Sequence, residues 1–521
     1  MAAPAPSRRW YLFAAALLLL GAAFLRLHQI DRRPLHADEA VQAYQTWRLL
    51  RGDGYTYDPA DRHGPFLYYA AAGVAKISGW SPAVLDETRL RSVTLLAGLG
   101  TIAVLLGSSA RLGRGAALLG TALLAAAPLA VIYDTYFVQE AWLCFFTWAL
   151  FFAVMRWWEA PTLAGAVLSG ALAGLMQATK ETSVLHFATL GVALVATRIH
   201  SADPARTFHL PNVPDERSAL RSGDVPVAVN SQPATGTSPL HKIAGLGRHW
   251  AHLLAALLTA VFVYVLFYSS FLTHWAGVAD GLRAYAHYAA RASGSAHDQP
   301  WTYYFAMLWP HARDGVRWGE PLLLFMAAAG AAFACTPRAT ATQRAIAVFT
   351  LALLLLYSAI PYKTPWLLLT PYVGLALLAG LGAVQSAAGL PANLARVMPA
   401  VLGLVILGAG VWRNFPALGR YANDERNPYV YQPTSSDLPR LVAAVGALPA
   451  GKKVAVVSPD HAWPLPWYWR DRAATGYFAA PPANVSDYDL VLFDSRLESP
   501  LPEGFAAYGL RPNVVLWCKA Q

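Results

Sequence analysis

The chain has 521 residues, of which 56% are hydrophobic and only 13% charged, and its mean hydropathy is +0.36. A soluble domain of this length cannot bury that much apolar surface, so the composition excludes ordinary soluble enzymes and binding modules. The net charge of +10 is spread along the chain without a basic stripe, which argues against nucleic-acid binding. The three cysteines predict no disulfide framework.

Repeated apolar runs indicate membrane spans, because each is close to the roughly 20 residues that cross a bilayer as a helix. Arg8 and Arg9 precede the first run, and no clear small-residue cleavage site follows it, so we interpret it as an uncleaved span. The expected spans lie near 10–27, 92–110, 114–132, 139–157, 162–178, 183–198, 250–271, 319–335, 343–360, 366–383 and 397–413.

An odd number of spans places the two ends of the chain on opposite sides of the membrane. If Arg8 and Arg9 hold the N-terminus in the cytoplasm, the C-terminus lies outside. We therefore expect a multi-pass protein of the inner cell membrane with its active site and C-terminus extracytoplasmic. The basic residues then predicted at cytoplasmic span ends are Arg111, Arg114, Arg156, Arg338, Arg344 and Arg396.

The first outer loop, residues 28–91, carries an acidic pair a few residues after the first span. Asp38 and Glu39 stand side by side there. Residues 39–51 and 64–79 are predicted to be interfacial helices, the latter because it is apolar but short and contains Lys76. If 64–79 spanned the membrane instead, the acidic pair would be separated from the other polar clusters.

Two further regions differ from the spans. Residues 199–247 are polar and rich in Pro, Ser and Gly, which is typical of a disordered linker, here cytoplasmic. From 414 to 521 a helix at 435–448 and strands at 452–458, 489–495 and 513–518 predict a small α/β domain. The fold class is thus an α-helical polytopic membrane domain, 1–413, followed by an extracytoplasmic α/β domain, 414–521.

Polar motifs that are far apart in sequence meet at the outer side of this topology. Ionisable groups near a bilayer are costly and usually face a cavity, so one shared cavity is the economical interpretation. The residues concerned, besides the acidic pair, are Asp134, Glu140, Lys180, Glu181, His297, Trp301, Tyr362 and Lys363.

The chemistry of the acidic pair has two interpretations. Adjacent helical residues point about 100° apart, so Asp38 and Glu39 cannot easily do one job. In the first interpretation Asp38 caps a helix and Glu39 favours the helix dipole. In the second, which we favour, Asp38 is a general base, and Glu39 orients it or helps to bind a cation.

The other candidates each have a functional and a structural interpretation. Lys363, flanked by Pro361 and Pro365, suits a phosphate or snorkels to the headgroups, and Arg89 and Arg91 allow the same two roles. Asp134 and Glu140 add negative charge to the site or cap a helix. His63 and His297 are metal ligands or hydrogen-bonding surface groups. The candidate metal site is His297 with Asp38 or Glu39, but no spacing identifies a divalent cation or any other cofactor.

Several motifs together resemble a known family. The acidic pair after the first span resembles the GT-C membrane glycosyltransferases, the superfamily of protein O-mannosyltransferases and the lipid A aminoarabinose transferase. More narrowly, the chain is similar to a prokaryotic family labelled "flippase activity-associated". The motifs are LHADEAVQAY, YDPADRHGPFLYY, FVQEAW, KET, HDQPWTYY, YKTPW, NPYVYQPTSSDL and VVSPDHAWPLPWYWR.

The resemblance implies a sugar donor linked to polyprenyl phosphate, an inverting transfer and, as catalytic residues, Asp38 with Asp134 or Glu140. It implies Lys363 as the residue that holds the lipid phosphate. The remaining residues predicted to bind substrate or lipid phosphate are Tyr362, Arg89, Arg91, Lys180, Glu181, His63 and Trp301.

The function we predict is a membrane glycosyltransferase of the hexosyltransferase type. Its partners are the polyprenyl-phosphate-linked sugar, membrane lipid and an acceptor glycan, lipid or protein. A flippase or flippase-associated component that binds the same lipid without chemistry is the alternative. A non-catalytic assembly protein is the third interpretation.

Overall fold

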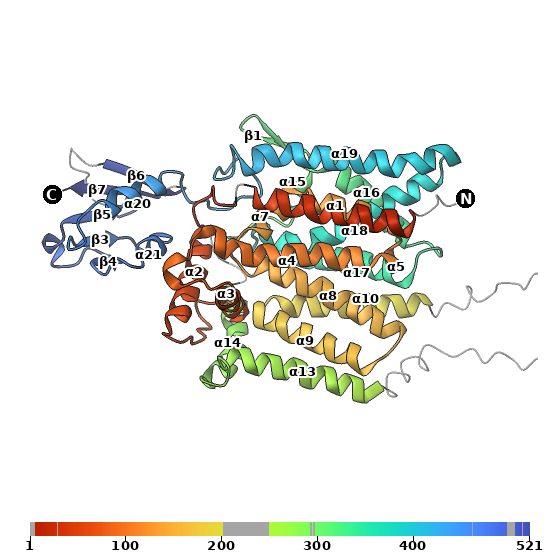
Figure 1. The fold of residues 1–521 in the computed structure, drawn as a ribbon, viewed down its shortest axis with the longest axis horizontal. Helices are drawn as coiled ribbons and strands as arrows, with labels where there is room; N and C mark the ends of the chain where they lie inside the picture. Colours follow the sequence, from red (N-terminus) through yellow and green to blue (C-terminus); the bar gives the residue numbers. More distant parts are fainter. Residues whose placement is uncertain are drawn as a thin grey trace, which may run out of the picture.

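A computed structural model describes residues 6–28, 30–201, 249–291, 294, 297–460, 462–497, 506–512 and 514–520. A long bundle of helices makes up most of the molecule, with a smaller sheet-containing domain at one end (Figure 1). The N-terminus lies at the opposite end of the bundle (Figure 1). The predicted linker 199–247 lies outside the described residues, except for 199–201, which continue a helix.

Each of the eleven predicted spans coincides with helix. Seven helices among the described residues are long and apolar enough to cross a membrane alone, and a bent pair adds an eighth. The chain is therefore a multi-pass membrane protein. The bundle helices are α1 (Arg8–Leu27), α4 (Glu87–Gly107), α6 (Arg114–Ala125), α7 (Pro128–Asp134), α8 (Glu140–Glu159), α9 (Leu163–Thr179), α10 (Ser183–Ser201), α13 (Trp250–Tyr268), α16 (Pro321–Ala334), α17 (Ala341–Ala359), α18 (Leu369–Ala388) and α19 (Ala392–Leu418).

The third predicted span is broken rather than straight. Its halves, α6 and α7, meet at an angle of 67°. The break falls before Pro128, which lacks a backbone N–H and cannot continue the hydrogen-bond ladder of α6. The freed carbonyls are bound by side chains, because Arg26 Nη1 lies 3.0 Å from the Ala125 oxygen and Asn414 Nδ2 lies 2.8 Å from the Ala126 oxygen.

Helix α18 forms the centre of the bundle, because 94% of the residues in the most apolar stretch of the span Pro365–Ala388 are buried. Glycines let the neighbouring helices approach it closely. A Cβ added at Gly330 of α16 would lie 1.9 Å from the carbonyl oxygen of Leu378. Close backbone approach at small residues is a common way in which membrane helices associate.

The variant Gly330→Ala tests this crossing. The new methyl would force α16 and α18 apart, and we expect a loss of about 1–3 kcal/mol in stability. Gly408→Ala in α19 is the matched control, because no heavy atom lies within 4 Å of a Cβ there. Thermal unfolding in detergent should show a lower melting temperature for Gly330→Ala and an unchanged one for Gly408→Ala. Equal melting temperatures would contradict the packing.

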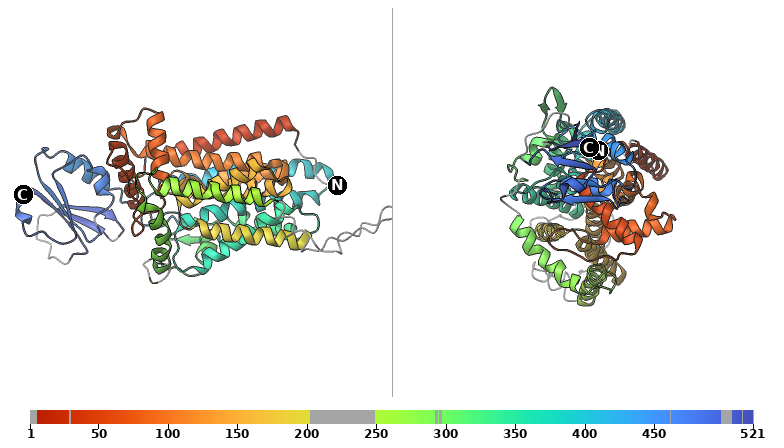
Figure 2. Two further views of the ribbon diagram at one scale, coloured as in Figure 1. Left: turned by 90° about the horizontal axis from the view of Figure 1, so that it is seen from below. Right: turned by 90° about the vertical axis from the view of Figure 1, so that its left-hand side faces the viewer.

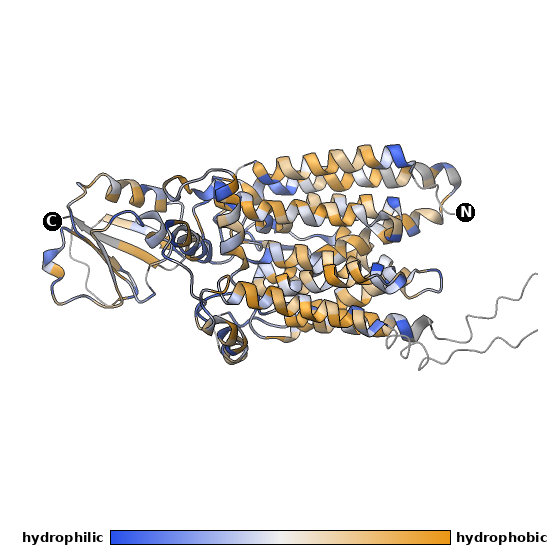
Figure 3. Ribbon diagram, turned by 60° about the horizontal axis from the view of Figure 1, so that its bottom comes forward, coloured by the Kyte–Doolittle hydropathy of each residue, from blue (hydrophilic) through white to orange (hydrophobic). Residues whose placement is uncertain are grey.

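Three further helices lie across the end of the bundle that faces the sheet domain (Figure 2). They are α2 (Ala37–Arg51), α3 (Phe66–Ile77) and α14 (Ala276–Arg291). With 12 residues, α3 is too short to cross a bilayer. Hydrophilic residues gather mainly at the two ends of the bundle, whereas its length is largely hydrophobic (Figure 3). The short elements are η1 (Pro82–Val84), α5 (Ser109–Leu112), α15 (Tyr303–Leu308), β1 (His311–Arg313), β2 (Val316–Trp318) and η4 (Pro365–Leu368). Helix α5 lies at the N-terminal end of the bundle (Figure 1).

The C-terminal domain is a five-stranded mixed sheet in the order β4-β3-β5-β7-β6. Strand β3 is parallel to β4 and β5, whereas β7 is antiparallel to β5 and β6. The predicted α/β domain is confirmed, although β4 and β6 were not predicted, and α19 continues past 413. Its elements are α20 (Leu438–Gly446), β3 (Val454–Val457), α21 (Leu465–Tyr468), β4 (Thr475–Phe478), η5 (Val485–Asp487), β5 (Leu490–Asp494), β6 (Ala506–Arg511) and β7 (Val514–Ala520).

Candidate functional site

The acidic pair opens helix α2, and His36 caps that helix. The imidazole Nδ1 of His36 accepts a hydrogen bond from the backbone N–H of Asp38 at 3.1 Å. In return the Glu39 carboxylate accepts from the backbone N–H of His36 at 3.0 Å, which completes a capping box. The cap fixes the start of α2 and turns the two carboxylates in different directions.

Glu39 is fully buried and faces an arginine. Both carboxylate oxygens accept from Arg91, at 2.8 Å each, and one also accepts from the backbone N–H of Phe137 at 2.9 Å. Burial raises the pKa of Glu39, but the charge and hydrogen bonds of Arg91 more than offset this and hold the pKa below its usual value. Glu39 thus ties α2 to α4 and to the turn before α8.

The Arg91 guanidinium is also fully hydrogen-bonded within the protein. Besides Glu39, its guanidinium donates to the carbonyl oxygens of Ile30 and Arg33 at 2.8 Å each and of Pro34 at 3.3 Å. All five of its N–H groups are therefore used within the protein. This geometry supports the structural interpretation of Arg91, as a clamp on the first outer loop, over the substrate-binding one.

Asp38 differs from its neighbour in being exposed. Its side chain is 52% accessible, and its Oδ2 lies 3.8 Å from Nδ1 of His36. No lysine or arginine forms an ion pair with it among the described residues. Its charge acts on Tyr136, His297 and Tyr431. Asp38 thus exposes its carboxylate to solvent near an aromatic wall, the side chains of Tyr136, Trp366 and Tyr431.

The structure brings two of the predicted motifs together next to Asp38. The backbone N–H of Lys363 donates to the His297 oxygen at 3.0 Å, and Asp298 and Tyr362 form a β-bridge. The His297 ring lies 4.8 Å from that of Tyr362 and bonds through Nδ1 to the Tyr431 hydroxyl. Burial lowers the pKa of His297, whereas the charge of Asp38 raises it.

Lys363 lies beside His297 and Tyr362, but its ammonium group is bonded to backbone carbonyl oxygens. Its Nζ donates to the oxygens of Ile360, Gln299 and Pro361 at 2.5, 3.0 and 3.5 Å, and the residue is 1% exposed. Burial lowers the pKa of its ammonium. All three ammonium hydrogens are thereby taken up in closing the turn after α17. A phosphate would have to displace one of these carbonyls.

Three more of the predicted acidic residues are buried and partnered. Asp134 pairs with Arg26 of α1 at 2.7 Å, and Glu140 pairs with Lys180. Glu181 accepts from the Tyr57 hydroxyl at 3.0 Å and lies 2.9 Å from Nδ1 of His63. The same nitrogen of His63 also lies 2.8 Å from the Tyr288 hydroxyl. The three carboxylates thus lie in separate pairs, each with partners of its own.

Arg89 and Trp301 stand apart from this group in the described residues. Arg89 pairs with Asp86 and donates to the Val84 oxygen at 2.8 Å, so it closes the turn before α4. Trp301 is 66% exposed, with Phe305 as its aromatic neighbour at 6.3 Å. Neither side chain contacts Asp38 in the part of the chain that the structure describes.

Sequence reasoning missed the aromatic wall and two basic residues of the first loop. The rings of Tyr136 and Trp366 lie 5.8 and 6.1 Å from that of His36, and Tyr431 packs against Trp366. The Arg33 guanidinium lies 4.9 Å from the Tyr136 ring centre. Tyr431 lies within NPYVYQPTSSDL, one of the motifs that carry the family resemblance, whereas Tyr136 directly precedes the motif FVQEAW.

No group of three or more His, Cys, Asp or Glu side chains is placed to hold a metal ion in the described ranges. Glu39 is turned toward Arg91, so the candidate metal site reduces to Asp38 and His297. Two ligands alone identify no metal.

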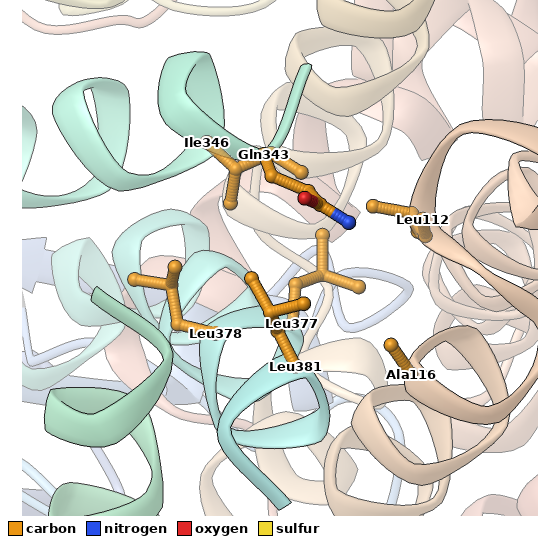
Figure 4. A pocket seen from close by; sticks show the side chains of 7 residues that line it. All are labelled: Leu112, Ala116, Gln343, Ile346, Leu377, Leu378 and Leu381. Atoms are coloured by element: carbon orange, nitrogen blue, oxygen red, sulfur yellow. The ribbon is translucent and has the colours of Figure 1, made fainter. Parts of the chain in front are cut away.

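Two hollows are distinct from the Asp38 region. A cavity of about 10 Å³ lies between α5, α6, α17 and α18, with the amide of Gln343 among leucines (Figure 4). It has room for about one water molecule and suits no substrate. A polar groove of about 770 Å³ lies between the β1–β2 hairpin, residues 423–436 and the end of β6.

Comparisons with known proteins agree with this architecture. Residues 62–208 match the profile of the family "Dolichyl-phosphate-mannose-protein mannosyltransferase". The structure resembles ArnT from Cupriavidus metallidurans bound to undecaprenyl phosphate, with a TM-score of 0.57, 15% identity and 98% of each chain covered.

It also resembles the oligosaccharyltransferase AglB from Archaeoglobus fulgidus in complex with an inhibitory peptide and a dolichol-phosphate. The TM-score there is 0.52, with 13% identity over 93% of this chain and 69% of that one. A comparison with the curated proteins gives no match.

Proposed function

Because the chain has the GT-C fold of the membrane glycosyltransferases, we propose that it transfers a sugar from a polyprenyl-phosphate donor to a hydroxyl group. The observation that carries the proposal is the contrast between Asp38 and the other candidate carboxylates. Glu39, Asp134 and Glu140 are each neutralised by a lysine or arginine, whereas Asp38 is half exposed and has no lysine or arginine partner among the described residues. A general base needs a free carboxylate within reach of its substrate.

The step we propose is a single displacement with inversion. The acceptor oxygen attacks the anomeric carbon from the face opposite the phosphate, and its proton passes to Asp38. The bond between the anomeric carbon and the phosphate oxygen breaks, and polyprenyl phosphate leaves with the electron pair. Glu39 positions Asp38 by fixing the first turn of α2, and Asp134 and Glu140 brace the site through their ion pairs.

We place this site outside the cytoplasm. The N-terminus and the ends of α10 and α13 that flank residues 202–248 lie at the end of the bundle opposite α2, the helix that begins with the acidic pair (Figure 1). Arg111 and Arg114 lie at that same far end, with Arg114 donating to the Pro6 oxygen. Basic residues concentrate on the cytoplasmic side of membrane proteins. If the protein is bacterial, we expect it in the inner membrane.

Binding of a lipid-linked sugar without chemistry is the second candidate. The pairing of most candidate carboxylates favours it, because those groups hold the fold rather than protonate or deprotonate a substrate. Such a flippase-type component would keep the donor site but would need no base.

The test is sugar transfer by the purified full chain in liposomes. Radiolabelled mannosyl, glucosyl and aminoarabinosyl undecaprenyl and dolichyl phosphates would be supplied with a panel of glycan, lipid and peptide acceptors. We expect a labelled product from at least one donor. Movement of donor across the bilayer without any product would support the second candidate instead.

A further inference from the structure

Arg33 is a buried cation that forms no ion pair among the described residues, although the charge of Glu39, which is paired with Arg91, acts on it through space. It is 5% exposed, and no carboxylate lies within ion-pair distance of it in the described part of the chain. Its Nη2 donates to the carbonyl and hydroxyl oxygens of Thr135 at 3.1 and 3.2 Å, but its Nη1 has no acceptor. An uncompensated buried charge is strongly unfavourable, so such a group calls for an anion.

His36 presents a second buried donor. Its Nδ1 accepts from the backbone N–H of Asp38, so we assign the ring proton of the neutral imidazole to Nε2. His36 is 5% exposed, and Nε2 has no acceptor among the described residues. A buried donor without an acceptor is costly. Capping of α2 uses only Nδ1, so it gives no role to the Nε2–H group.

The two unmet donors share one neighbour. The Arg33 guanidinium lies 4.9 Å from the centre of the Tyr136 ring, and the His36 ring lies 5.8 Å from it. Asp38 follows His36 by two residues at the start of α2 and acts electrostatically on the same tyrosine. A charged fork and a neutral N–H donor therefore flank one aromatic ring beside the proposed base.

We infer that Arg33 Nη1 and His36 Nε2 bind an oxyanion of the substrate at Tyr136, and that this oxyanion is the phosphate of the polyprenyl donor. Arginine suits phosphate because its planar fork donates to two oxygens. The inference rests on the proposed function for the identity of the ligand. On this inference Arg33 and His36 bind the phosphate in place of Lys363, because the ammonium hydrogens of Lys363 are already bonded to backbone carbonyls.

Thermal unfolding of the full chain in nanodiscs tests this through ligand-induced stabilisation. The probes are undecaprenyl phosphate, undecaprenol and inorganic phosphate. We expect undecaprenyl phosphate, but not undecaprenol, to raise the melting temperature of the wild type. His36→Asn keeps a helix-capping side chain but removes the Nε2 donor, so its own melting temperature should stay close to that of the wild type. Its affinity for undecaprenyl phosphate should fall about tenfold or more.

Arg33→Gln is the second variant, and the same loss of affinity is expected for it. His287→Asn, at an exposed histidine of α14, is the matched control and should bind as the wild type does. Unchanged affinity in folded His36→Asn and Arg33→Gln would overturn the inference, as would an equal shift with undecaprenol. Stabilisation by inorganic phosphate but not by the lipid would keep an oxyanion site and reject the donor as its source.

A further variant separates this inference from the proposed function. Asp38→Asn should retain the shift with undecaprenyl phosphate, because it leaves both donors in place. Lipid binding by the wild type that His36→Asn weakens, together with no transfer by any protein, would reject the enzyme and retain the binding site.

Discussion

Asp38→Asn should lower the rate of sugar transfer by about 10²- to 10⁴-fold, because an amide cannot accept the proton of the acceptor hydroxyl. The helix cap survives this change, since His36 binds the backbone N–H of residue 38 and not its side chain. The donor affinity should change little. Initial rates over a range of donor concentrations would therefore show a fall in kcat with KM nearly constant.

Asp53→Asn is the control for this variant. Asp53 follows the other end of α2 and is 39% exposed, beside Arg48 at 3.5 Å. Its loss should leave the transfer rate unchanged. Asp38→Glu should retain part of the activity, because the carboxylate remains but is displaced. A rate for Asp38→Asn within tenfold of the wild type would refute the role of Asp38 as the base.

Glu39→Gln should be the most damaging of the conservative substitutions for stability. It leaves Arg91 charged and buried without its carboxylate, and breaking such a pair costs about 3–5 kcal/mol. The first outer loop would lose its connection to α4 and to the turn at Phe137. Thermal unfolding in detergent, followed by size-exclusion chromatography, measures the effect.

The matched control is Glu159→Gln, at a carboxylate paired with Arg111 at 2.6 Å but 47% exposed. An exposed pair of this kind contributes about 0–1 kcal/mol. Because the pKa of Glu39 is lowered in the folded state, its stabilisation is present above the ordinary carboxyl pKa. It is lost as the pH falls through the lowered value. The difference in melting temperature between the wild type and Glu39→Gln should therefore become smaller in acid. Similar melting temperatures of Glu39→Gln and Glu159→Gln at neutral pH would contradict the structural role of the Glu39–Arg91 pair.

The spans and the sheet domain were predictable because their signals are local. Apolar runs of membrane-crossing length mark the long helices, and the buried strands β3 and β5 read as Val- and Leu-rich segments. Strand β4, with the sequence TGYF, and β6, with the sequence AAYGLR, carry glycine and no continuous apolar run, so their pairing depends on neighbours that are distant in sequence. The break between α6 and α7 was missed because the apolar run continues through Pro128.

The site was predictable only as a set of residues at one end of the bundle. Charge and position selected Asp38, Glu39 and Arg91, but no sequence pattern shows which carboxylate will be paired. The bond between Glu39 and Arg91 joins residues that lie 52 positions apart. Arg33 was passed over because one arginine among several in a loop gives no signal until the structure shows that it forms no ion pair with the described residues.

The broken helix α6–α7 has a consequence for how the protein is made. Its freed carbonyls are bound by Arg26 from the first span and by Asn414 from the last, and the Tyr133 hydroxyl donates to the Tyr429 oxygen beyond that last span. During synthesis α6 and α7 leave the ribosome long before residue 414 exists. The Ala125 carbonyl can bind Arg26 at once, but the Ala126 carbonyl lacks its Asn414 partner until α19 has been inserted. The contacts that hold the break between α6 and α7 are therefore completed only at the last stage of membrane insertion.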